Sequence, residues 1–163
     1  MTPTSFPQPS SPVNLSPAGI EFVLFSNIRV SDILIVFFVF VFVFQDCAFN
    51  KLKSDTALKV SFQGNMRVDH NVKCSRWYFK FNGNECSGPM TIEAVVYNNW
   101  SSGRNTNQLH HRSFEGYCEN IPQGTVRVEL WVGKCSSQTL GDAYTGWNSV
   151  SRIMIEEVSR PQS

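Results

Sequence analysis

The chain has 163 residues, which is enough for one domain and an additional segment. Fourteen basic and thirteen acidic residues give a net charge of +1, so no strong field indicates a nucleic acid or an acidic partner. Charged residues make up 17% of the chain, below the average of about 25%, whereas aromatic residues make up 13%. These numbers, without a heptad or collagen period, exclude a disordered chain, a coiled coil and a collagen-like rod.

The first 46 residues differ in composition from the rest. Residues 1–19 are rich in proline and serine and predict disorder, because such a stretch cannot bury enough apolar surface to offset its ordering entropy. Residues 33–44 are consecutive apolar residues, ILIVFFVFVFVF, and are too few for a membrane-spanning helix, which needs about 20. For residues 1–46, a signal-like leader, a membrane anchor and a gene-model artefact all stay open.

The artefact hypothesis comes from the codons of residues 33–45. The string VFFVFVFVFQ (36–45) back-translates to a pyrimidine-rich tract, and Gln45 can be encoded by CAG, the usual end of a splice acceptor. The hypothesis is therefore that residues 33–45 are translated intron. Mature transcripts that encode this segment in frame with Cys47 would refute it.

Period-two alternation of apolar residues predicts strands along much of residues 47–163. Strands are expected at 58–63 and 66–72, joined by a Gly64-Asn65 turn, then at 77–81 before Asn82-Gly83, at 90–97, at 125–132 and at 149–158. Long loops are expected at about 98–113 and 136–148. This spacing is typical of an all-β protein with a β-sandwich or jelly-roll architecture.

The cysteines all lie in the second part of the chain, at Cys47, Cys74, Cys86, Cys118 and Cys135. No two of them form a C-x-x-C pair, which argues against a zinc ribbon or a thioredoxin-type redox site. Their number favours disulfides in an oxidising compartment over buried thiols in a cytosolic protein.

Residues suited to catalysis are few. Cys118 and His111 are a conceivable nucleophile pair, but nothing in the sequence orients them, and a disulfide would consume the thiol. His110 and His111 are adjacent, so on a strand they would face opposite sides and would not chelate one metal ion. With His70 as the remaining histidine, we expect no catalytic residue, no cofactor and no metal site.

The loop around residues 98–113 carries two further signals. Asn99-Trp100-Ser101 is a glycosylation sequon, and Asn99 is the acceptor we expect to be used, ahead of the Asn14 sequon in the leader. Arg104 and Arg112 lie near the two adjacent histidines, in a stretch without acidic residues. This stretch is either a weak patch for anions or glycosaminoglycans or, more simply, a solvated loop.

Four ordered blocks carry a family resemblance. They are CAFNKLKSDTALKVSFQG (47–64), RWYFKFNGNECSGPMTIEAVVY (76–97), ELWVGKCS (129–136) and GDAYTGWNSVSRIMIEEV (141–158). Together they resemble the C-terminal domain of the collagen triple helix repeat-containing protein family over about residues 47–158. The resemblance implies that residues 47–163 form a jelly roll like that of C1q and tumour necrosis factor.

The resemblance also implies a function. Members of this family are secreted extracellular-matrix glycoproteins, so we expect this protein to be a non-catalytic binding module that forms a homotrimer. Cell migration, collagen deposition and planar-polarity Wnt signalling through Frizzled- and Ror-type receptors are the processes implied. The alternatives are a membrane-anchored C1q/TNF-like ligand, with residues 20–44 inserted, and a Cys-dependent enzyme.

The family pattern further bears on the cysteines. The family carries a signal peptide and a Gly-X-Y segment before this domain, and it has extra cysteines upstream of Cys47 and beside Cys74; none of these is recognisable here. Without these cysteines, we expect Cys47 to be unpaired. Five cysteines with one left over allow 15 arrangements; we expect Cys118 to bond with Cys135 across a separation of 17 residues, which leaves Cys74 to bond with Cys86.

Overall fold

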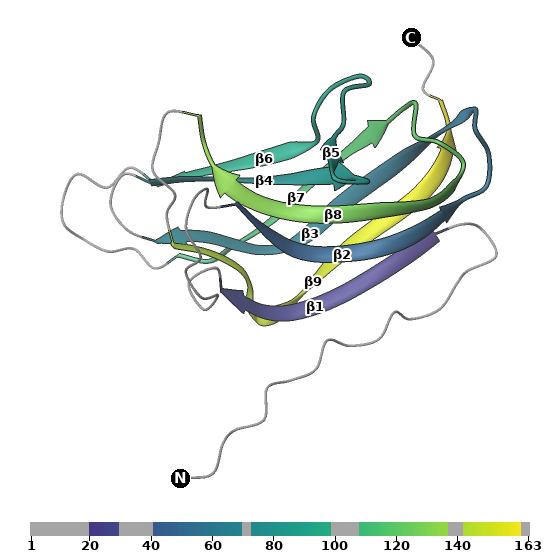
Figure 1. The fold of residues 1–163 in the computed structure, drawn as a ribbon. Coiled ribbons are helices and arrows are strands. Elements are labelled where there is room, and N and C mark those ends of the chain that lie inside the picture. Colours follow the sequence, from purple (N-terminus) through teal and green to yellow (C-terminus); the bar gives the residue numbers. More distant parts are fainter. Residues whose placement is uncertain (1–19, 30–40, 70–72, 99–107, 137–141, 161–163) are drawn as a thin grey trace.

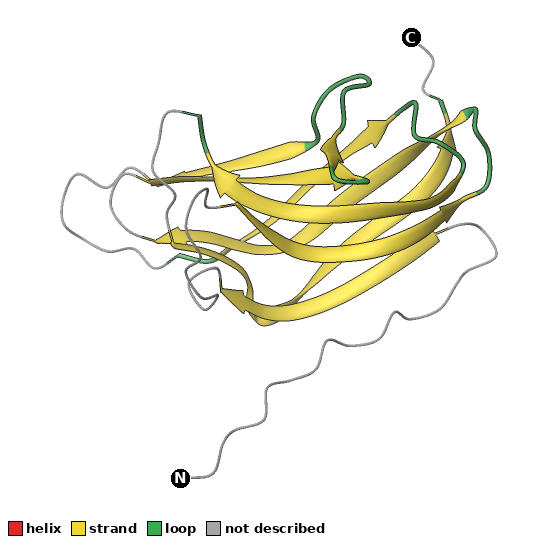
Figure 2. Ribbon diagram, viewed as in Figure 1, coloured by secondary structure: helices red, strands yellow, loops and turns green. Residues whose placement is uncertain are grey.

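The described elements of the protein are all β-strands (Figure 2). The computed structural model describes residues 20–29, 41–69, 73–98, 108–136 and 142–160, with side chains described from residue 45 onwards. The strands are β1 (Ile20–Arg29), β2 (Val41–Lys51), β3 (Thr56–Asp69), β4 (Lys73–Phe81), β5 (Asn84–Glu85), β6 (Glu93–Asn98), β7 (His110–Cys118), β8 (Gly124–Lys134) and β9 (Asp142–Ser159). The all-β class predicted from the sequence is confirmed.

Two antiparallel sheets pack face to face (Figure 1). One sheet, here called the β9 sheet, has the strand order β1-β9-β3-β7. The other, the β8 sheet, has the order β2-β8-β4, and both β5 and β6 pair with β4. Successive strands from β1 to β4 alternate between the sheets, and so do β7, β8 and β9. This is the order of a jelly roll, so the predicted β-sandwich is confirmed.

The core lies between the two sheets. It consists of the apolar residues that alternate along each strand and face the opposite sheet. Trp77 is the largest fully buried side chain, and its Nε1 donates a hydrogen bond of 2.8 Å to Thr145 Oγ1 of the opposite sheet. Burying an apolar side chain of this kind contributes about 1.5–3 kcal/mol. Other core residues that are at most 4% exposed include Leu58, Phe62, Phe79, Val128, Leu130 and Ile153. The alternation seen in the sequence therefore defines the two inner faces.

The predicted turn at Gly64-Asn65 is wrong. Strand β3 continues through both residues, which lie opposite Arg112 and His111 of β7. A Cβ atom on Gly64 would lie only 2.3 Å from the Oγ of Ser151 in β9. The glycine therefore permits a close approach of two strands and does not reverse the chain, while the register with β9 shifts after Gln63.

The other predicted strands are confirmed in the middle of their ranges, but some of their predicted ends are wrong. Strands β4, β6, β8 and β9 overlap the predicted ranges, and Asn82 (φ 49°) and Gly83 (φ 82°) form the tight β4–β5 turn. The two predicted loops are shorter than expected, because β7 begins at His110 and β9 begins at Asp142. Polar residues on the outer face of the edge strand β7 hid its alternation. Residues 70–72, 99–107 and 137–141 lie outside the described residues.

The sandwich also includes residues that the sequence analysis placed in the N-terminal segment. Residues 20–29 form β1 and pair with β9, with Phe22 opposite Met154. Strand β2 begins at Val41, before the expected domain start at Cys47, and pairs with β8. Composition pointed to a leader, whereas the alternating FVFVF sequence suits a strand. Among the residues with a described position, no helix is long and apolar enough to cross a membrane.

Candidate binding surface

The two disulfides differ from the predicted pairs. Cys74 bonds with Cys135, and Cys86 bonds with Cys118, each with Cα atoms 5.7 Å apart. Strands β4 and β8 are hydrogen-bonded neighbours, with Ser75 opposite Lys134, so the next residues, Cys74 and Cys135, face each other. The predicted Cys118–Cys135 and Cys74–Cys86 pairs are wrong, because they were chosen by separation along the chain, whereas the packing of strands far apart in the chain determines which sulfur atoms meet.

The Cys86–Cys118 bridge connects the two sheets. Cys86 follows β5 in the β8 sheet, whereas Cys118 is the last residue of β7 in the β9 sheet. Because Cys118 is bonded to Cys86, its sulfur is not a nucleophile for the pair considered with His111. His111 is exposed on β7.

Cys47 belongs to neither bridge. Its side chain is 7% exposed and points into the core, and its Sγ donates to the backbone oxygen of Val128 at 3.5 Å. The Cys47 thiol is therefore enclosed by the core and is not accessible in the way that a reactive cysteine is.

Only part of the stretch considered as either an anion patch or a solvated loop lies within the described residues. His110, His111 and Arg112 are consecutive exposed residues at the start of β7. No group of three or more potential metal ligands occurs in the part of the chain that the structure describes. Asn14, His70, Asn99 and Arg104 lie outside the described residues, so glycosylation at Asn99 stays a prediction.

On the outer face of the β8 sheet, Arg76 holds two carboxylates. Its Nη1 donates to Glu85 Oε1 at 3.0 Å, its Nε donates to Glu93, and its guanidinium carbon lies 4.1 Å from the centre of the Tyr78 ring. The hydrogen bond with Glu85, and then Glu93, outweighs desolvation and raises the pKa of Arg76 above its ordinary value. Burial, followed by the charge of Glu85, raises the pKa of Tyr78. The arginine thus links β4, β5 and β6.

Aromatic residues continue this arrangement along the same face. The rings of Tyr78 and Trp131 stack with centroids 6.5 Å apart, and Lys80 Nζ lies 4.0 Å from the centre of the Trp131 ring. Nearer β2, Arg127 Nε donates to Asp46 at 2.7 Å. These charged and aromatic side chains are engaged with one another across the strands.

The outer face of the β9 sheet exposes large apolar side chains instead. Strand β9 bulges at residues 146–149, here called the β9 bulge, where its register shifts against both β1 and β3. Gly146 (φ 69°) and Asn148 (φ 48°) have left-handed conformations on either side of Trp147. Trp147 is 43% exposed, and Val150, directly after the bulge, is 54% exposed. The bulge therefore presents an indole ring to solvent.

Side chains of β9 and of the neighbouring strand β3 hold the β9 bulge in place. The Tyr144 ring meets Trp147 edge-on at 5.4 Å, and the guanidinium of Arg67 lies 3.9 Å from the centre of the Tyr144 ring. Asn65 Nδ2 of β3 donates to Ser149 Oγ at 2.9 Å. An exposed tryptophan on a braced support is typical of an anchor in a protein interface. The outer face of the β9 sheet at this bulge is therefore the candidate binding surface.

The sequence analysis missed this surface. It placed residues 136–148 in a loop, and the resemblance block that contains GDAYTGWNS gave no role to Trp147. The available signal was a tryptophan between a glycine and an asparagine, the two residues that most readily adopt left-handed conformations.

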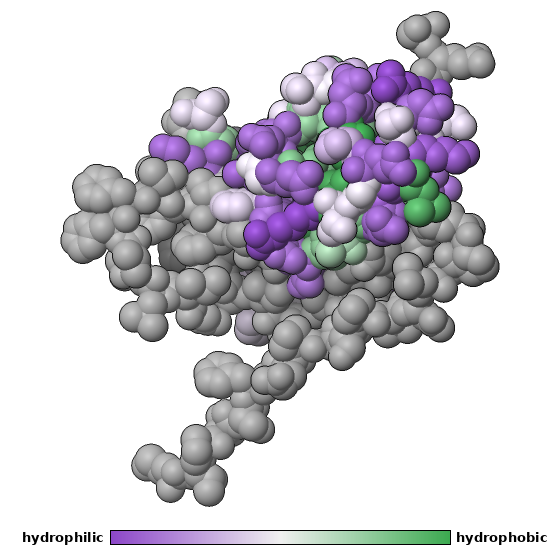
Figure 3. Space-filling model, turned by 45° about the vertical axis from the view of Figure 1, so that its right-hand side comes forward, coloured by the Kyte–Doolittle hydropathy of each residue, from purple (hydrophilic) through white to green (hydrophobic). Residues whose placement is uncertain are grey.

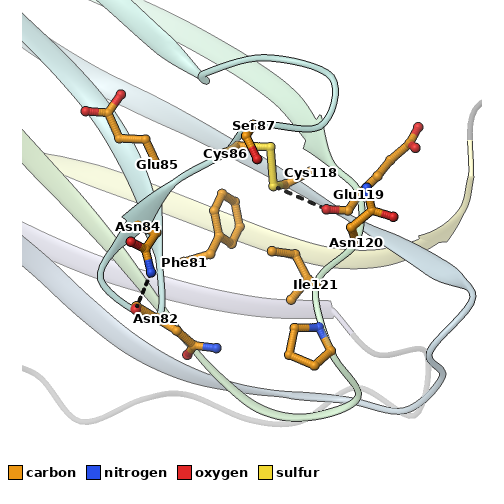
Figure 4. Close-up of a pocket in the computed structure, with 11 residues that line it drawn as sticks. Phe81, Asn82, Asn84, Glu85, Cys86, Ser87, Cys118, Glu119, Asn120 and Ile121 are labelled. Atoms are coloured by element: carbon orange, nitrogen blue, oxygen red, sulfur yellow. Dashed lines mark hydrogen bonds between the residues drawn. A yellow bond between two sulfur atoms is a disulfide. The ribbon is translucent and has the colours of Figure 1, made fainter.

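A small depression lies at the other end of the sandwich, beside the Cys86–Cys118 bridge (Figure 4). It has a volume of about 260 Å³ and includes Phe81 and Ile121 in its lining. Figure 4 shows the Asn84 amide turned towards the Asn82 carbonyl oxygen, with which it forms a hydrogen bond of 3.3 Å. Small-molecule sites typically have volumes of about 300–1,000 Å³, so the volume of this depression is below that range.

The described surface in Figure 3 is mostly hydrophilic, with small apolar areas.

The fold and the two bridges together define a disulfide-bonded jelly-roll domain, which fits an extracellular location. A protein-family model described as CTHRC1, C-terminal domain matches residues 42–155. The chain therefore belongs to this family of extracellular-matrix-related domains, and the resemblance inferred from the four blocks is confirmed. The match begins inside residues 33–45, so it covers the last four residues of the segment in the translated-intron hypothesis, which stays a prediction.

Proposed function

We propose that this protein is a secreted, non-catalytic binding module of the extracellular matrix that acts as a homotrimer. In this proposal the trimer binds Frizzled- and Ror-type receptors, modulates planar-polarity Wnt signalling, and thereby influences cell migration and collagen deposition. Membership of the CTHRC1 C-terminal domain family and the two disulfides support the extracellular setting. The observation that carries the binding role is the exposure of Trp147 and Val150.

The trimer contact is assigned to the outer face of the β9 sheet. Exposed there are Trp147 and Val150 of β9 and, on β7, Tyr117, which is 38% exposed. Removing such side chains from water contributes about 25 cal/mol for each Å² of apolar surface, and aromatic residues dominate interface energetics. The outer face of the β8 sheet, with its charges already engaged, stays available for a receptor.

Light scattering on the purified protein tests the assembly. We expect the mass of a trimer at micromolar concentration and a smaller species for Trp147→Ala. Met90→Ser is the matched control, because Met90 is 70% exposed outside the β9 sheet and should leave the trimer intact. A monomer at micromolar concentration contradicts the trimer.

A binding assay tests the receptor step separately. Immobilised Frizzled and Ror ectodomains should retain the trimer and should retain Trp147→Ala less well, through lost avidity. If neither ectodomain retains the assembled protein, the signalling role is wrong even when the trimer exists.

A further inference from the structure

Strand β6 is an edge of the β8 sheet. It pairs with β4 from Lys73–Asn98 to Tyr78–Glu93, and among the described strands it has no other partner. In Figure 1, β6 lies directly above β4. One side of the β6 backbone is therefore unpaired within the described structure.

The direction of the β6 backbone groups follows from one hydrogen bond. Phe79 N donates to Ile92 O at 3.1 Å, so the polar groups of Ile92 point towards β4. In an antiparallel ladder both backbone groups of a residue point to the same side, and this side alternates along the strand. Ala94 and Val96 therefore point towards β4, whereas Glu93, Val95 and Tyr97 present N–H and C=O groups to the open edge.

The open edge also carries exposed apolar side chains. Val95 is 52% exposed and Tyr97 is 50% exposed, both on the outer face of the sheet. Protected edges usually contain charged residues, above all lysine, or a proline or a β-bulge. The β6 sequence EAVVYN has one charged residue, Glu93, which Arg76 binds, and its regular register against β4 includes no lysine, proline or bulge. Such a strand is a template for another strand.

Both ends of β6 are held in place. At its start, Glu93 accepts a hydrogen bond from Arg76. At its end, Asn98 Nδ2 donates to the Val68 backbone oxygen of β3 at 3.2 Å. An edge that is already held extended loses little conformational entropy when a second strand pairs with it.

We propose that the β6 edges of two copies of this chain pair antiparallel across a twofold axis, which joins two β8 sheets into one continuous sheet. A register centred on Val95 places Val95 opposite its own copy and Glu93 opposite Tyr97. All three residues point their backbone groups to the open edge, so they form hydrogen-bonded pairs, and no like charges face each other. This contact is separate from the proposed trimer contact and can connect trimers to one another.

The expected strength of this contact is low. One strand edge buries less than the roughly 1,200 Å² of a stable interface, so an isolated pair of copies should associate weakly. A trimer carries three such edges, and several simultaneous contacts raise the overall affinity without any new interaction. The β6 edge would thus support assembly beyond the trimer.

Cysteine cross-linking tests the contact and its register. Directly opposite hydrogen-bonded residues have Cα atoms about 5.5 Å apart, within disulfide range, so Val95→Cys should form a cross-linked dimer under mild oxidation. In the same register, Tyr97 lies opposite Glu93 and about 13 Å from the other Tyr97, so Tyr97→Cys should not cross-link. Equal cross-linking of both variants, or of neither, overturns the proposal.

A proline substitution tests the backbone contacts. Val95→Pro removes an N–H group that points to the open edge and leaves the bonds to β4 unchanged, so the circular dichroism spectrum should not change. Its self-association, measured by sedimentation, should weaken about tenfold relative to Val95→Thr. Unchanged association of a folded Val95→Pro protein overturns the proposal, and the cross-linking result decides the matter if this variant does not fold.

Discussion

The outer faces of the two sheets differ in how their large side chains are used. On the β8 sheet, Arg76 binds two carboxylates, and the Tyr78 and Trp131 rings stack under cationic side chains. On the β9 sheet, Trp147 and Val150 are about half exposed to solvent. The contacts around Arg76 and Trp131 stabilise the fold, whereas Trp147 and Val150 leave apolar surface for a partner. Within the β8 sheet, comparable apolar exposure is found at Val95 and Tyr97 of the edge strand β6.

The largest expected effect comes from the disulfide at the end of the β8-sheet ladder. Replacing Cys74 and Cys135 by alanine removes a cross-link between residues 61 positions apart in the chain. In the loop-entropy model, this loss lowers the unfolding free energy by about 4 kcal/mol. The matched variant lacks Cys86 and Cys118, whose separation is 32 residues, and should lose about 0.6 kcal/mol less. Urea unfolding followed by tryptophan fluorescence measures both. A larger loss from the second variant would show that the link between sheets matters more than loop length.

The next effect tests whether the β8-sheet face stabilises the fold. Arg76→Leu should lower the unfolding free energy by about 2 kcal/mol, because it leaves two adjacent carboxylates without their shared donor. Asp46→Asn is the control on the same face, because the Asp46 and Arg127 side chains are 40% and 59% exposed, so the loss of this exposed pair should cost much less. Chemical denaturation compares the two. Equal losses would contradict the distinction between engaged and exposed contacts.

A smaller effect concerns Glu157 at the end of the β9 sheet. Burial raises the pKa of Glu157, but hydrogen bonds from Thr56, Leu52 and Lys53 outweigh it, so the pKa lies below the ordinary value of 4.5. A lowered pKa stabilises the fold above pH 4.5, and this stabilisation is lost as the pH falls through the folded-state pKa. Glu157→Gln should cost about 1 kcal/mol at pH 7. It should also flatten the fall in melting temperature below pH 4.5, and a profile as steep as that of the unaltered protein would be inconsistent with this account.

The smallest effect is expected on the outer face of the β9 sheet. Lys59 Nζ lies 3.3 Å from Glu115 Oε2, but the two side chains are 29% and 59% exposed. Glu115 raises the pKa of Lys59 through a hydrogen bond and its charge. This stabilisation is complete below pH 10.5 and is lost as the pH rises through the raised pKa. Glu115→Gln should change the unfolding free energy by about 0.3 kcal/mol, and less in high salt. A loss above 1 kcal/mol, measured by denaturant unfolding, would mean that this face also stabilises the fold.

The sequence predicted those strands in which inward-facing residues are apolar and outward-facing residues are polar. In β4 and β8, apolar residues alternate with charged ones, so 77–81 and 125–132 were identified, as was the Asn82-Gly83 turn. Strand β7 was missed because it is an edge strand with polar residues along its outer face. Strand β1 was missed because the composition of the N-terminal segment suggested a leader.

What the sequence alone determined is the all-β class, the family and the set of inward-facing residues, because local alternation encodes which side of a strand is buried. Only the tertiary structure decided that Gly64 lies within a strand, because a glycine is needed there where Ser151 of β9 approaches closely. It also decided that Cys74 bonds with Cys135, since strand neighbours far apart in the chain set which sulfur atoms meet. The exposure of Trp147 and the open edge of β6 are likewise properties of strand order. Strand order depends on long-range pairing, which period and spacing along the chain do not encode.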